Sequence, residues 1–366
     1  MLDSTYMTGK GPDLHPPQFP SLSVYGLAPT SGACHWYRIR EPLRGLAGIG
    51  ATTEFGELFE EAIVRRHNTV LCHLPHGDDL TQAWEYLWEA RYHRLVLDID
   101  DDVWVWPDGS DQQKYWTAER KAQLEKCIRL AHLVTTPSRI IAEKIKYQLQ
   151  LNDHVAILPN YLPAWTLQLP RTKPEQFTVG YQGAPQGVHQ ADLDMISEEL
   201  FWFLEKCPDA RLLFFGQPRQ LPGAGSFASR VNFIPWETHL PNYYRNLASN
   251  MTVGIGPLRK SPYTAAKSGV RAAELACLGI PSVVSDLEPY RGWVSHRVTG
   301  YQIGYADIQG WRKTLIKLYR SPDLVDRISR QARAAAFQFT TENNAWEWDR
   351  AYRSVGPVVE AASPAV

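Results

Sequence analysis

The sequence carries almost no excess of charge of either sign. Lys and Arg number 38 against 39 Asp and Glu, which leaves a formal net charge of −1. This balance gives no overall electrostatic footprint for nucleic acid or for an anionic membrane. No apolar run approaches the roughly 20 residues of a membrane-spanning helix, and no basic stretch followed by an apolar one marks a secretory signal. We therefore expect a cytoplasmic protein without a membrane span.

Cysteine is scarce as well. The chain has five cysteines, an odd number, and none of them forms a CxxC pair: Cys34, Cys72, Cys127, Cys207 and Cys277. Such spacing indicates neither a disulfide framework nor a zinc site, and it favours a reducing compartment.

Short apolar strands alternate with helical segments of 10–15 residues on both sides of segment 162–176, which holds three prolines. The expected strands cover 22–29, 51–59, 68–74, 94–104, 132–138 and 155–160, and then 177–183, 210–216, 230–236, 251–258, 280–285 and 299–304. This α/β pattern predicts two Rossmann-like, doubly wound domains facing a cleft, each a parallel sheet with helices on both faces. Ligands of such sheets bind outside the carboxyl ends of the strands.

The expected domain limits follow from composition and periodicity. We expect an irregular arm over 1–20, an N-terminal domain over 21–161, a linker over 162–176 and a C-terminal domain over 177–340. A last helix within 341–366 is expected to cross back to the N-terminal domain before a tail. Thr117 and Ser138 are predicted N-caps of helices in the first half.

The first loop of the second half has features that suit a phosphate. The strand ends at Gly183, and Gly187 and His189 follow before a helix. Glycine allows a ligand to approach the backbone closely, and a helix start offers free N–H groups. His189 either donates to a phosphate oxygen or caps the helix, and the sequence leaves both roles open.

A second loop follows the strand that ends at Pro257-Leu258. We expect a helix to begin near residues 265–268, which places Lys267 and Ser268 where a diphosphate would bind. On such a helix Lys267, Arg271 and Glu274 share one face, either as a solvent-facing ion-pair ladder or as part of a site. Small apolar neighbours leave little exposed surface at Glu274, so its carboxylate must be paired or must accept hydrogen bonds.

The stretch KSGVRAAELACLGIPSVVS, residues 267–285, resembles the donor-site signature of group 1 (GT4-like) retaining glycosyltransferases of GT-B architecture. The resemblance is to a branch found in phage genomes and bacterial polysaccharide clusters, and it covers roughly residues 22–353. Its other matches are spaced motifs in the same order: Tyr37-Arg38-Ile39, Pro42, Asp98–Asp102, Leu158-Pro159-Asn160, Gly183, His189, Asp192, Pro257-Leu258, Pro289-Tyr290, Thr299-Gly300 and Trp311.

The resemblance implies transfer of a sugar from a nucleotide-sugar donor, UDP-, GDP- or similar, to an acceptor hydroxyl with retention of configuration. Glu274 would hold the ribose hydroxyls, and Lys267 and Ser268 would face the diphosphate. The full implied donor-binding set is Gly183, His189, Pro257, Leu258, Lys267, Ser268, Arg271 and Glu274. One position departs from the pattern: Ala266 stands where many members have a glutamate that contacts the donor sugar. The identity of the sugar therefore does not carry over.

The aspartate cluster after the strand over 94–104 has several readings. Asp98-Ile99-Asp100 matches the D-x-D motif that holds Mn²⁺ in the other glycosyltransferase architecture, GT-A. Because the donor loops lie in the other half and GT-B enzymes usually use helix N-termini and cations instead, we expect no metal cofactor. Asp100 or Asp101 would instead orient an acceptor hydroxyl or take its proton, unless they cap the next segment or bind water.

Arg38 is the other candidate catalytic residue of the first half. Its planar guanidinium would cover the donor diphosphate, or it would form a salt bridge across the N-terminal helix.

The acceptor is open on sequence grounds. A virion protein, a glycan and a modified DNA base all remain candidates, and nothing indicates the oligomeric state. Two other functions also fit the same residues: a sugar-nucleotide epimerase or hydrolase, and a protein that binds a nucleotide sugar without catalysis.

Overall fold

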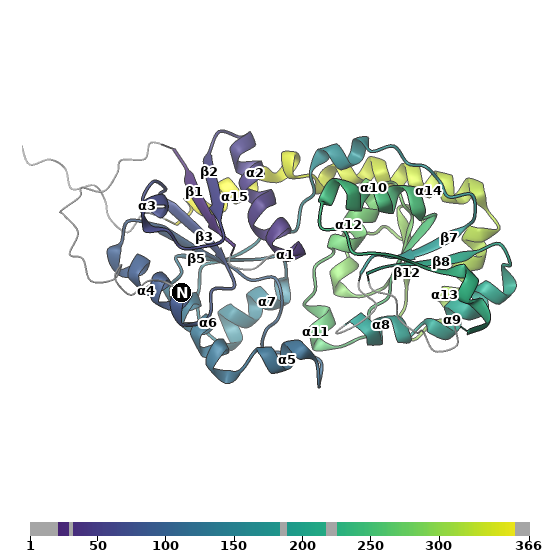
Figure 1. Cartoon of the computed structure of the whole chain (residues 1–366), viewed down its shortest axis with the longest axis horizontal. Helices are drawn as coiled ribbons and strands as arrows, with labels where there is room; N and C mark the ends of the chain where they lie inside the picture. The colour runs from purple at the N-terminus through teal and green to yellow at the C-terminus, as the bar shows by residue number, and fades with distance from the viewer. Residues whose placement is uncertain (1–20, 29–31, 184–188, 217–224, 356–366) are drawn as a thin grey trace, which may run out of the picture. The chain divides into compact units, whose positions relative to one another are not determined.

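The computed structural model describes residues 21–28, 32–183, 189–216 and 225–355 (Figure 1). The expected arm over 1–20 and Gly187 lie outside these residues. The chain forms two compact units. Among the described residues, the N-terminal unit contains 21–104, 116–158 and those from Ala345 onward. The C-terminal unit contains Val105–Tyr115 and Pro159–Asn344.

The N-terminal unit is built on a six-stranded parallel sheet. Its strands are β1 (Ser23–Leu27), β2 (Thr52–Gly56), β3 (Thr69–His73), β4 (Arg94–Asp98), β5 (Leu133–Thr136) and β6 (Val155–Ile157), in the order β2-β1-β3-β4-β5-β6. Every residue of β1, β3 and β5 is buried, as expected of strands covered on both faces. The direction of winding reverses between β1 and β3.

The helices of this unit are α1 (Ala33–His35), a π-helix (Trp36–Arg40), α2 (Glu41–Gly48), α3 (Glu61–Val64), α4 (Asp78–Ala90), α6 (Ala118–Leu130), α7 (Arg139–Glu143), a second π-helix (Lys144–Gln148) and most of α15 (Thr341–Arg353). Thr117 caps α6, since its side chain accepts from the Arg120 N–H. The predicted cap at Ser138 is wrong: Ser138 precedes α7, but its side chain makes no capping bond. Instead its own N–H donates to the Thr136 hydroxyl at 3.2 Å.

The C-terminal unit has a second six-stranded parallel sheet. Its strands are β7 (Thr178–Tyr181), β8 (Arg211–Phe215), β9 (Val231–Ile234), β10 (Val253–Gly256), β11 (Ser282–Ser285) and β12 (Gly300–Ile303), in the order β12-β11-β10-β7-β8-β9. Here the winding reverses between β7 and β10. This is the strand order of a dinucleotide-binding Rossmann sheet.

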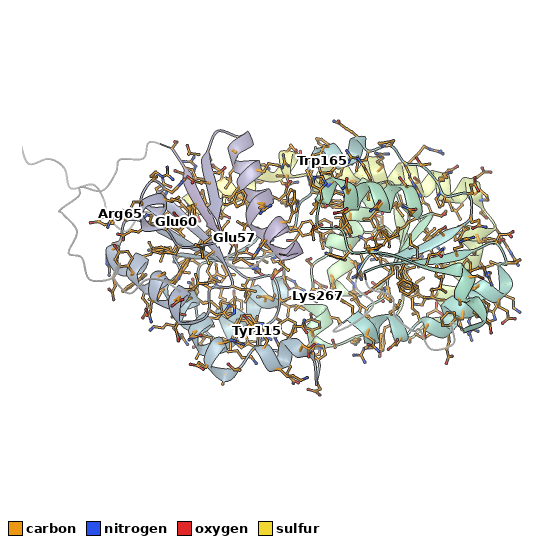
Figure 2. The ribbon with its side chains drawn as sticks, viewed as in Figure 1. Glu57, Glu60, Arg65, Tyr115, Trp165 and Lys267 are labelled. Carbon is orange, nitrogen blue, oxygen red and sulfur yellow. The ribbon has the colours of Figure 1, made fainter. Side chains whose placement is uncertain are left out.

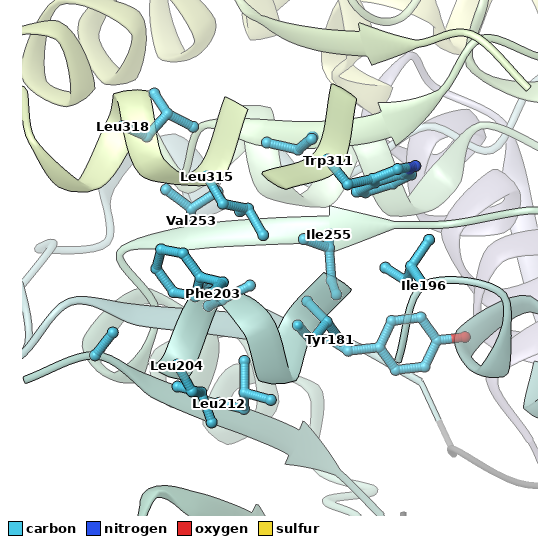
Figure 3. Packing of buried hydrophobic residues seen from close by; sticks show 14 of the residues in the cluster. Tyr181, Ile196, Phe203, Leu204, Leu212, Val253, Ile255, Trp311, Leu315 and Leu318 are labelled. Carbon is cyan, nitrogen blue, oxygen red and sulfur yellow. The ribbon is translucent and has the colours of Figure 1, made fainter. Parts of the chain in front are cut away.

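The principal helices of this unit are α5 (Asp111–Tyr115), α8 (Gln190–Asp194), α9 (Ser197–Lys206), α10 (Leu240–Asn250), α11 (Pro262–Ala265), α12 (Val270–Cys277), α13 (Ile308–Tyr319) and α14 (Pro322–Ala335). Helices α10 and α12 lie on one face of the sheet, and α9 and α13 lie on the other (Figure 1). On the α9 and α13 face, Phe203, Trp311 and Leu315 pack over Val253 and Ile255 in the core (Figure 3).

The expected linker, 162–176, has structure of its own. It forms a 3₁₀-helix over Ala164–Gln168, and the Arg171 guanidinium donates to the Thr252 carbonyl at 2.8 Å. No helix in the described part of the chain has the length and apolar character that crossing a bilayer requires.

Candidate functional site

The winding reversal of the C-terminal unit brings two loops together. Strands β7 and β10 are hydrogen-bonded neighbours, so Gln182-Gly183 after β7 and Pro257-Leu258 after β10 leave the same edge of the sheet. Pro257 and Leu258 are buried, and the Ser285 hydroxyl bonds both the N–H and the carbonyl of Leu258, at 2.8 and 3.1 Å. The start of the second loop is therefore held in one conformation at the position where such sheets bind ligands.

Lys267 and Ser268 do not begin a helix, and the expected helix start near 265–268 is wrong. A capping box at Ser261 starts the short α11, and α12 begins only at Val270, after Gly269. A Cβ at Gly269 would overlap the Pro289 carbonyl oxygen and the Trp293 ring, so only glycine fits. Lys267 therefore does not share a helical face with Arg271 and Glu274.

Lys267 and Ser268 lie instead in the turn between α11 and α12. The Lys267 ammonium (labelled in Figure 2) is 4.4 Å from the centroid of the Tyr263 ring. The indole of Trp106 packs on the same tyrosine, with ring centroids 5.0 Å apart. The Ser268 hydroxyl accepts a hydrogen bond of 3.1 Å from the Asn160 amide. Lys267 is thus a cation supported by an aromatic face.

Glu274 is 5% exposed, which excludes the solvent-facing ion-pair ladder. Its Oε2 accepts a hydrogen bond of 2.5 Å from the Gln182 amide and lies 3.5 Å from the Tyr243 hydroxyl. Burial raises the pKa of Tyr243 well above its usual range, and the Glu274 charge raises it further, so this phenol stays protonated and donates. The carboxylate is held by hydrogen-bond donors, as its apolar surroundings predict.

Arg271, one helical turn before Glu274 on α12, supplies a half-buried positive charge. Its guanidinium lies 4.7 Å from the centroid of the Tyr181 ring, and its Nε donates to the Gln182 carbonyl at 3.1 Å. A Cβ at Gly183 would lie 2.9 Å from Arg271 Nη2, so glycine lets the chain pass the guanidinium. Burial opposes the charge on Arg271, yet electrostatic interactions with Tyr181, Tyr290 and the Asp192 carboxylate hold its pKa above the usual range. The site keeps a permanent cation.

Four buried polar atoms at this edge have no hydrogen-bond partner within the described residues: Tyr181 Oη, Gln182 Oε1, His189 Nδ1 and Asp192 Oδ2. Figure 3 shows the Tyr181 hydroxyl pointing away from the packed core. His189 occupies the N-cap position of α8 without a side-chain cap bond, so the capping role does not account for it. Because buried polar groups are nearly always satisfied, these atoms indicate a polar ligand next to Arg271.

Arg38 lies in the N-terminal unit and is fully engaged with protein atoms. Its Nε and Nη2 donate to the two Asp98 oxygens at 2.9 and 2.6 Å, and its Nη1 donates to the Leu158 carbonyl at 2.7 Å. The Thr135 hydroxyl adds a bond of 2.5 Å to Asp98. With a side chain 1% exposed, Arg38 fits the salt bridge of its two sequence-based roles, not the contact with a diphosphate.

Asp100 forms a pair with His73, a residue that the sequence did not single out. Asp100 Oδ1 lies 2.8 Å from His73 Nε2. Burial lowers the pKa of His73, but the charge and hydrogen bond of Asp100, together with the charge of Asp98, outweigh burial and raise the pKa above its usual value. Burial likewise raises the pKa of Asp100, but His73 holds it well below the usual range. The pair is therefore ionised, at the carboxyl end of β3 and next to the winding reversal of this sheet.

Asp101 and Asp102 follow Asp100 in the chain. Asp102 binds the Lys144 ammonium and accepts from the Trp104 N–H at 3.3 Å, and Asp101 is half-buried. Within the described part of the chain, no group of three or more His, Cys, Asp or Glu residues is arranged to hold a metal ion.

Among the comparisons with known proteins, only the one with solved structures gives matches. No family model and no curated protein matches the chain. A solved glycosyltransferase of Rickettsia africae matches over 92% of this chain and 99% of its own, with a TM-score of 0.64 at 10% identity. An α-glucosyltransferase bound to UDP and a 13-mer DNA containing an HMU base matches over 91% of this chain and 100% of its own, with a TM-score of 0.62 at 11% identity. HepE of Anabaena in complex with UDP matches over 91% of this chain and 100% of its own, with a TM-score of 0.58 at 12% identity.

The chain has the GT-B fold. The two Rossmann-like sheets of this GT-B protein each reverse their winding once, and the reversals position the candidate residues of each unit: His73 after β3, Gln182 and Gly183 after β7, and Pro257 and Leu258 after β10.

Gln182, Tyr243 and His73 were missed by sequence reasoning. Gln182 and His73 each stand at the end of an expected strand, and polar residues at that place line the ligand edge of a parallel sheet. The sequence therefore contained a signal that could have identified both residues. Tyr243 lies within an ordinary amphipathic helix, α10, and nothing local distinguishes it from Tyr244 beside it.

Proposed function

We propose that the chain is a glycosyltransferase that moves a sugar from a UDP-sugar to an acceptor hydroxyl. The observation that carries the proposal is the buried Glu274 carboxylate, held by Gln182 and Tyr243, next to the half-buried cation of Arg271. A carboxylate and a cation side by side suit a ribose joined to a diphosphate. The solved structures of HepE and of the α-glucosyltransferase contain UDP, which supports the choice of nucleotide.

In this proposal Glu274 accepts hydrogen bonds from the ribose hydroxyls. Arg271 and Lys267 attract the diphosphate and stabilise the negative charge that grows on it as the sugar leaves. The leaving phosphate takes the proton of the incoming hydroxyl on the same face of the sugar, so configuration is retained without a protein nucleophile. The two cations take the place of a metal cofactor.

The acceptor would bind at the carboxyl edge of the N-terminal sheet. There the ionised Asp100, paired with His73, orients the acceptor hydroxyl by accepting its hydrogen bond. Asp101 lies next to it in the chain and is half-buried. The acceptor class, protein, glycan or modified DNA, is to be read from the reaction product.

A panel of UDP-, GDP- and ADP-sugars tested by thermal shift examines the donor half of the proposal. We expect UDP-sugars to raise the melting temperature most, and a panel in which no nucleotide raises it would refute the proposal. Mass spectrometry of each acceptor class with the best donor then tests transfer. Nucleotide released without any acceptor would identify a hydrolase, an epimerised sugar would identify an epimerase, and binding without turnover would identify a binding protein.

A further inference from the structure

His189 and Asp192 form an incomplete pair beside the proposed diphosphate position. His189 Nδ1 and Asp192 Oδ2 lie 3.7 Å apart, close enough for an ion pair but too far for a hydrogen bond. Asp192 is 2% exposed, and neither atom has a hydrogen-bond partner within the described residues. A buried acceptor next to a potential donor without a bond between them is costly, so the arrangement is suited to a change when a ligand arrives.

The other oxygen of Asp192 fixes the carboxylate in place. Its Oδ1 accepts a hydrogen bond of 2.8 Å from the Arg259 N–H. Arg259 is in the loop between β10 and α11, and its carbonyl in turn accepts from the Thr264 hydroxyl on α11. Asp192 therefore joins α8 to the loop that leads to Lys267, and its Oδ2 keeps a set position facing the imidazole.

Charged groups from each neighbouring element act on His189. Burial lowers its pKa first, the cations Arg271 on α12 and Lys267 before α12 lower it further, and Asp192 on α8 opposes them. At neutral pH the imidazole is consequently uncharged. A diphosphate next to Arg271 and Lys267 would offset both cations and add negative charge of its own, and each effect favours the protonated ring.

We propose that donor binding places one proton from solvent on His189, and that Asp192 is the positioning residue that accepts the hydrogen bond of the protonated ring. Nδ1–H donates to Asp192 Oδ2, and Nε2–H is then free to donate to a phosphate oxygen. The inference deepens the proposed function and rests on it.

The direction of the pH dependence follows from linkage. A group whose pKa is higher in the complex than in the free protein strengthens binding fully below its free pKa. The gain is lost as the pH rises through the pKa of the complex. Donor affinity should therefore fall between pH 6.5 and pH 8.5, by up to about tenfold per pH unit if a full proton is taken up.

Isothermal titration calorimetry with UDP-glucose at pH 7, in HEPES and in Tris, measures this proton directly. Both phosphates of UDP-glucose stay singly ionised in this range, so a buffer-dependent heat reports on the protein. We expect uptake of about half to one proton per bound ligand by wild type. The Asp192→Asn variant should still bind UDP-glucose but with almost no proton uptake. Its affinity should be about tenfold below that of wild type at pH 6.5 and close to that of wild type at pH 8.5.

Two further variants complete the test. His189→Gln should also lose the uptake. Its side chain is 28% exposed, so this variant serves if Asp192→Asn does not fold. Glu198→Gln, an exposed acid on α9, should behave as wild type. Binding without proton uptake, or uptake that persists in both site variants, would overturn this inference alone, whereas a failure of every sugar nucleotide to bind would overturn the proposed function and the inference together.

Discussion

Gln182 donates a hydrogen bond of 2.5 Å to Glu274, and this bond connects the end of β7 to the middle of α12. The two residues are 92 positions apart in the chain. One oxygen of the carboxylate is thus fixed by the protein, which orients the group for the ribose that we propose it binds. Preorganisation of this kind lowers the entropic cost of binding.

Replacing this carboxylate by an amide should weaken nucleotide binding without unfolding the protein. In Glu274→Gln the charge is lost, and charge-assisted hydrogen bonds contribute about 1.5–3 kcal/mol, or roughly 10- to 100-fold in affinity. Titration calorimetry with UDP checks the change, and Glu175→Gln, an exposed acid of the same unit, is the matched control. Wild-type affinity in Glu274→Gln would remove Glu274 from the donor site.

Arg38→Met should destabilise the N-terminal unit strongly. The substitution leaves the buried Asp98 carboxylate without its cation, and breaking a buried ion pair in this way costs about 3–5 kcal/mol. Urea unfolding followed by circular dichroism gives the difference. Arg40→Met, whose exposed guanidinium lies 4.6 Å from the centroid of the Phe55 ring, should cost much less. If the two variants proved equally stable, Arg38 would not have the structural role assigned to it.

The His73–Asp100 pair should make stability depend on pH. His73 has a raised pKa, so its contribution is complete below its unfolded value of about 6.5 and is lost as the pH rises through the folded value. Asp100 has a lowered pKa, so its contribution is lost only at acid pH. The stability difference between wild type and Asp100→Asn should therefore shrink as the pH rises from 6 to 9.

Urea unfolding at several pH values tests this dependence. The exposed Asp153→Asn in the same unit should give a small and flat difference. A difference for Asp100→Asn that grew with pH would mean that His73 is not charged in the folded protein.

Restoring the glutamate that the family pattern carries at Ala266 should harm the protein. Ala266 is 2% exposed at the end of α11, and a longer charged side chain there must be buried or must displace its neighbours. We expect Ala266→Glu to lower the free energy of unfolding by about 2 kcal/mol or more. The exposed Ala228→Glu should change little. A stable Ala266→Glu with tighter binding of a UDP-sugar would show that the position is open to the donor.

The apolar pattern of the sequence was sufficient to predict the sheets. Each described strand lies within a segment that the pattern predicted. The signal is clearest for fully buried strands such as β3 and β5, because a strand covered on both faces needs a continuous apolar run. The loops after β7 and β10 were predicted on the same basis. The burial of Glu274 also followed from its small apolar neighbours.

The remaining features depend on contacts that are distant in the sequence. The chain leaves the helical conformation around Lys267, and Gly269 there passes close to Pro289 and Trp293, about twenty residues later, a contact that no local pattern reports. The sequence left two roles open for Arg38, and the choice between them depends on Asp98, sixty residues away, which accepts hydrogen bonds from its guanidinium. The role of His73 depends on Asp100, which follows the neighbouring strand β4 and lies within hydrogen-bonding distance.

The chain passes between the two units after Trp104, Tyr115, Leu158 and Asn344. Neither unit is therefore encoded by one continuous stretch. A fragment that began at Pro159 and ended at Asn344 would lack Trp106, whose indole packs on Tyr263 next to Lys267. Truncation mapping would consequently damage the C-terminal unit that it was meant to isolate. A chimera that exchanged this unit with that of another GT-B protein would have to carry the 105–115 segment along with the C-terminal sheet.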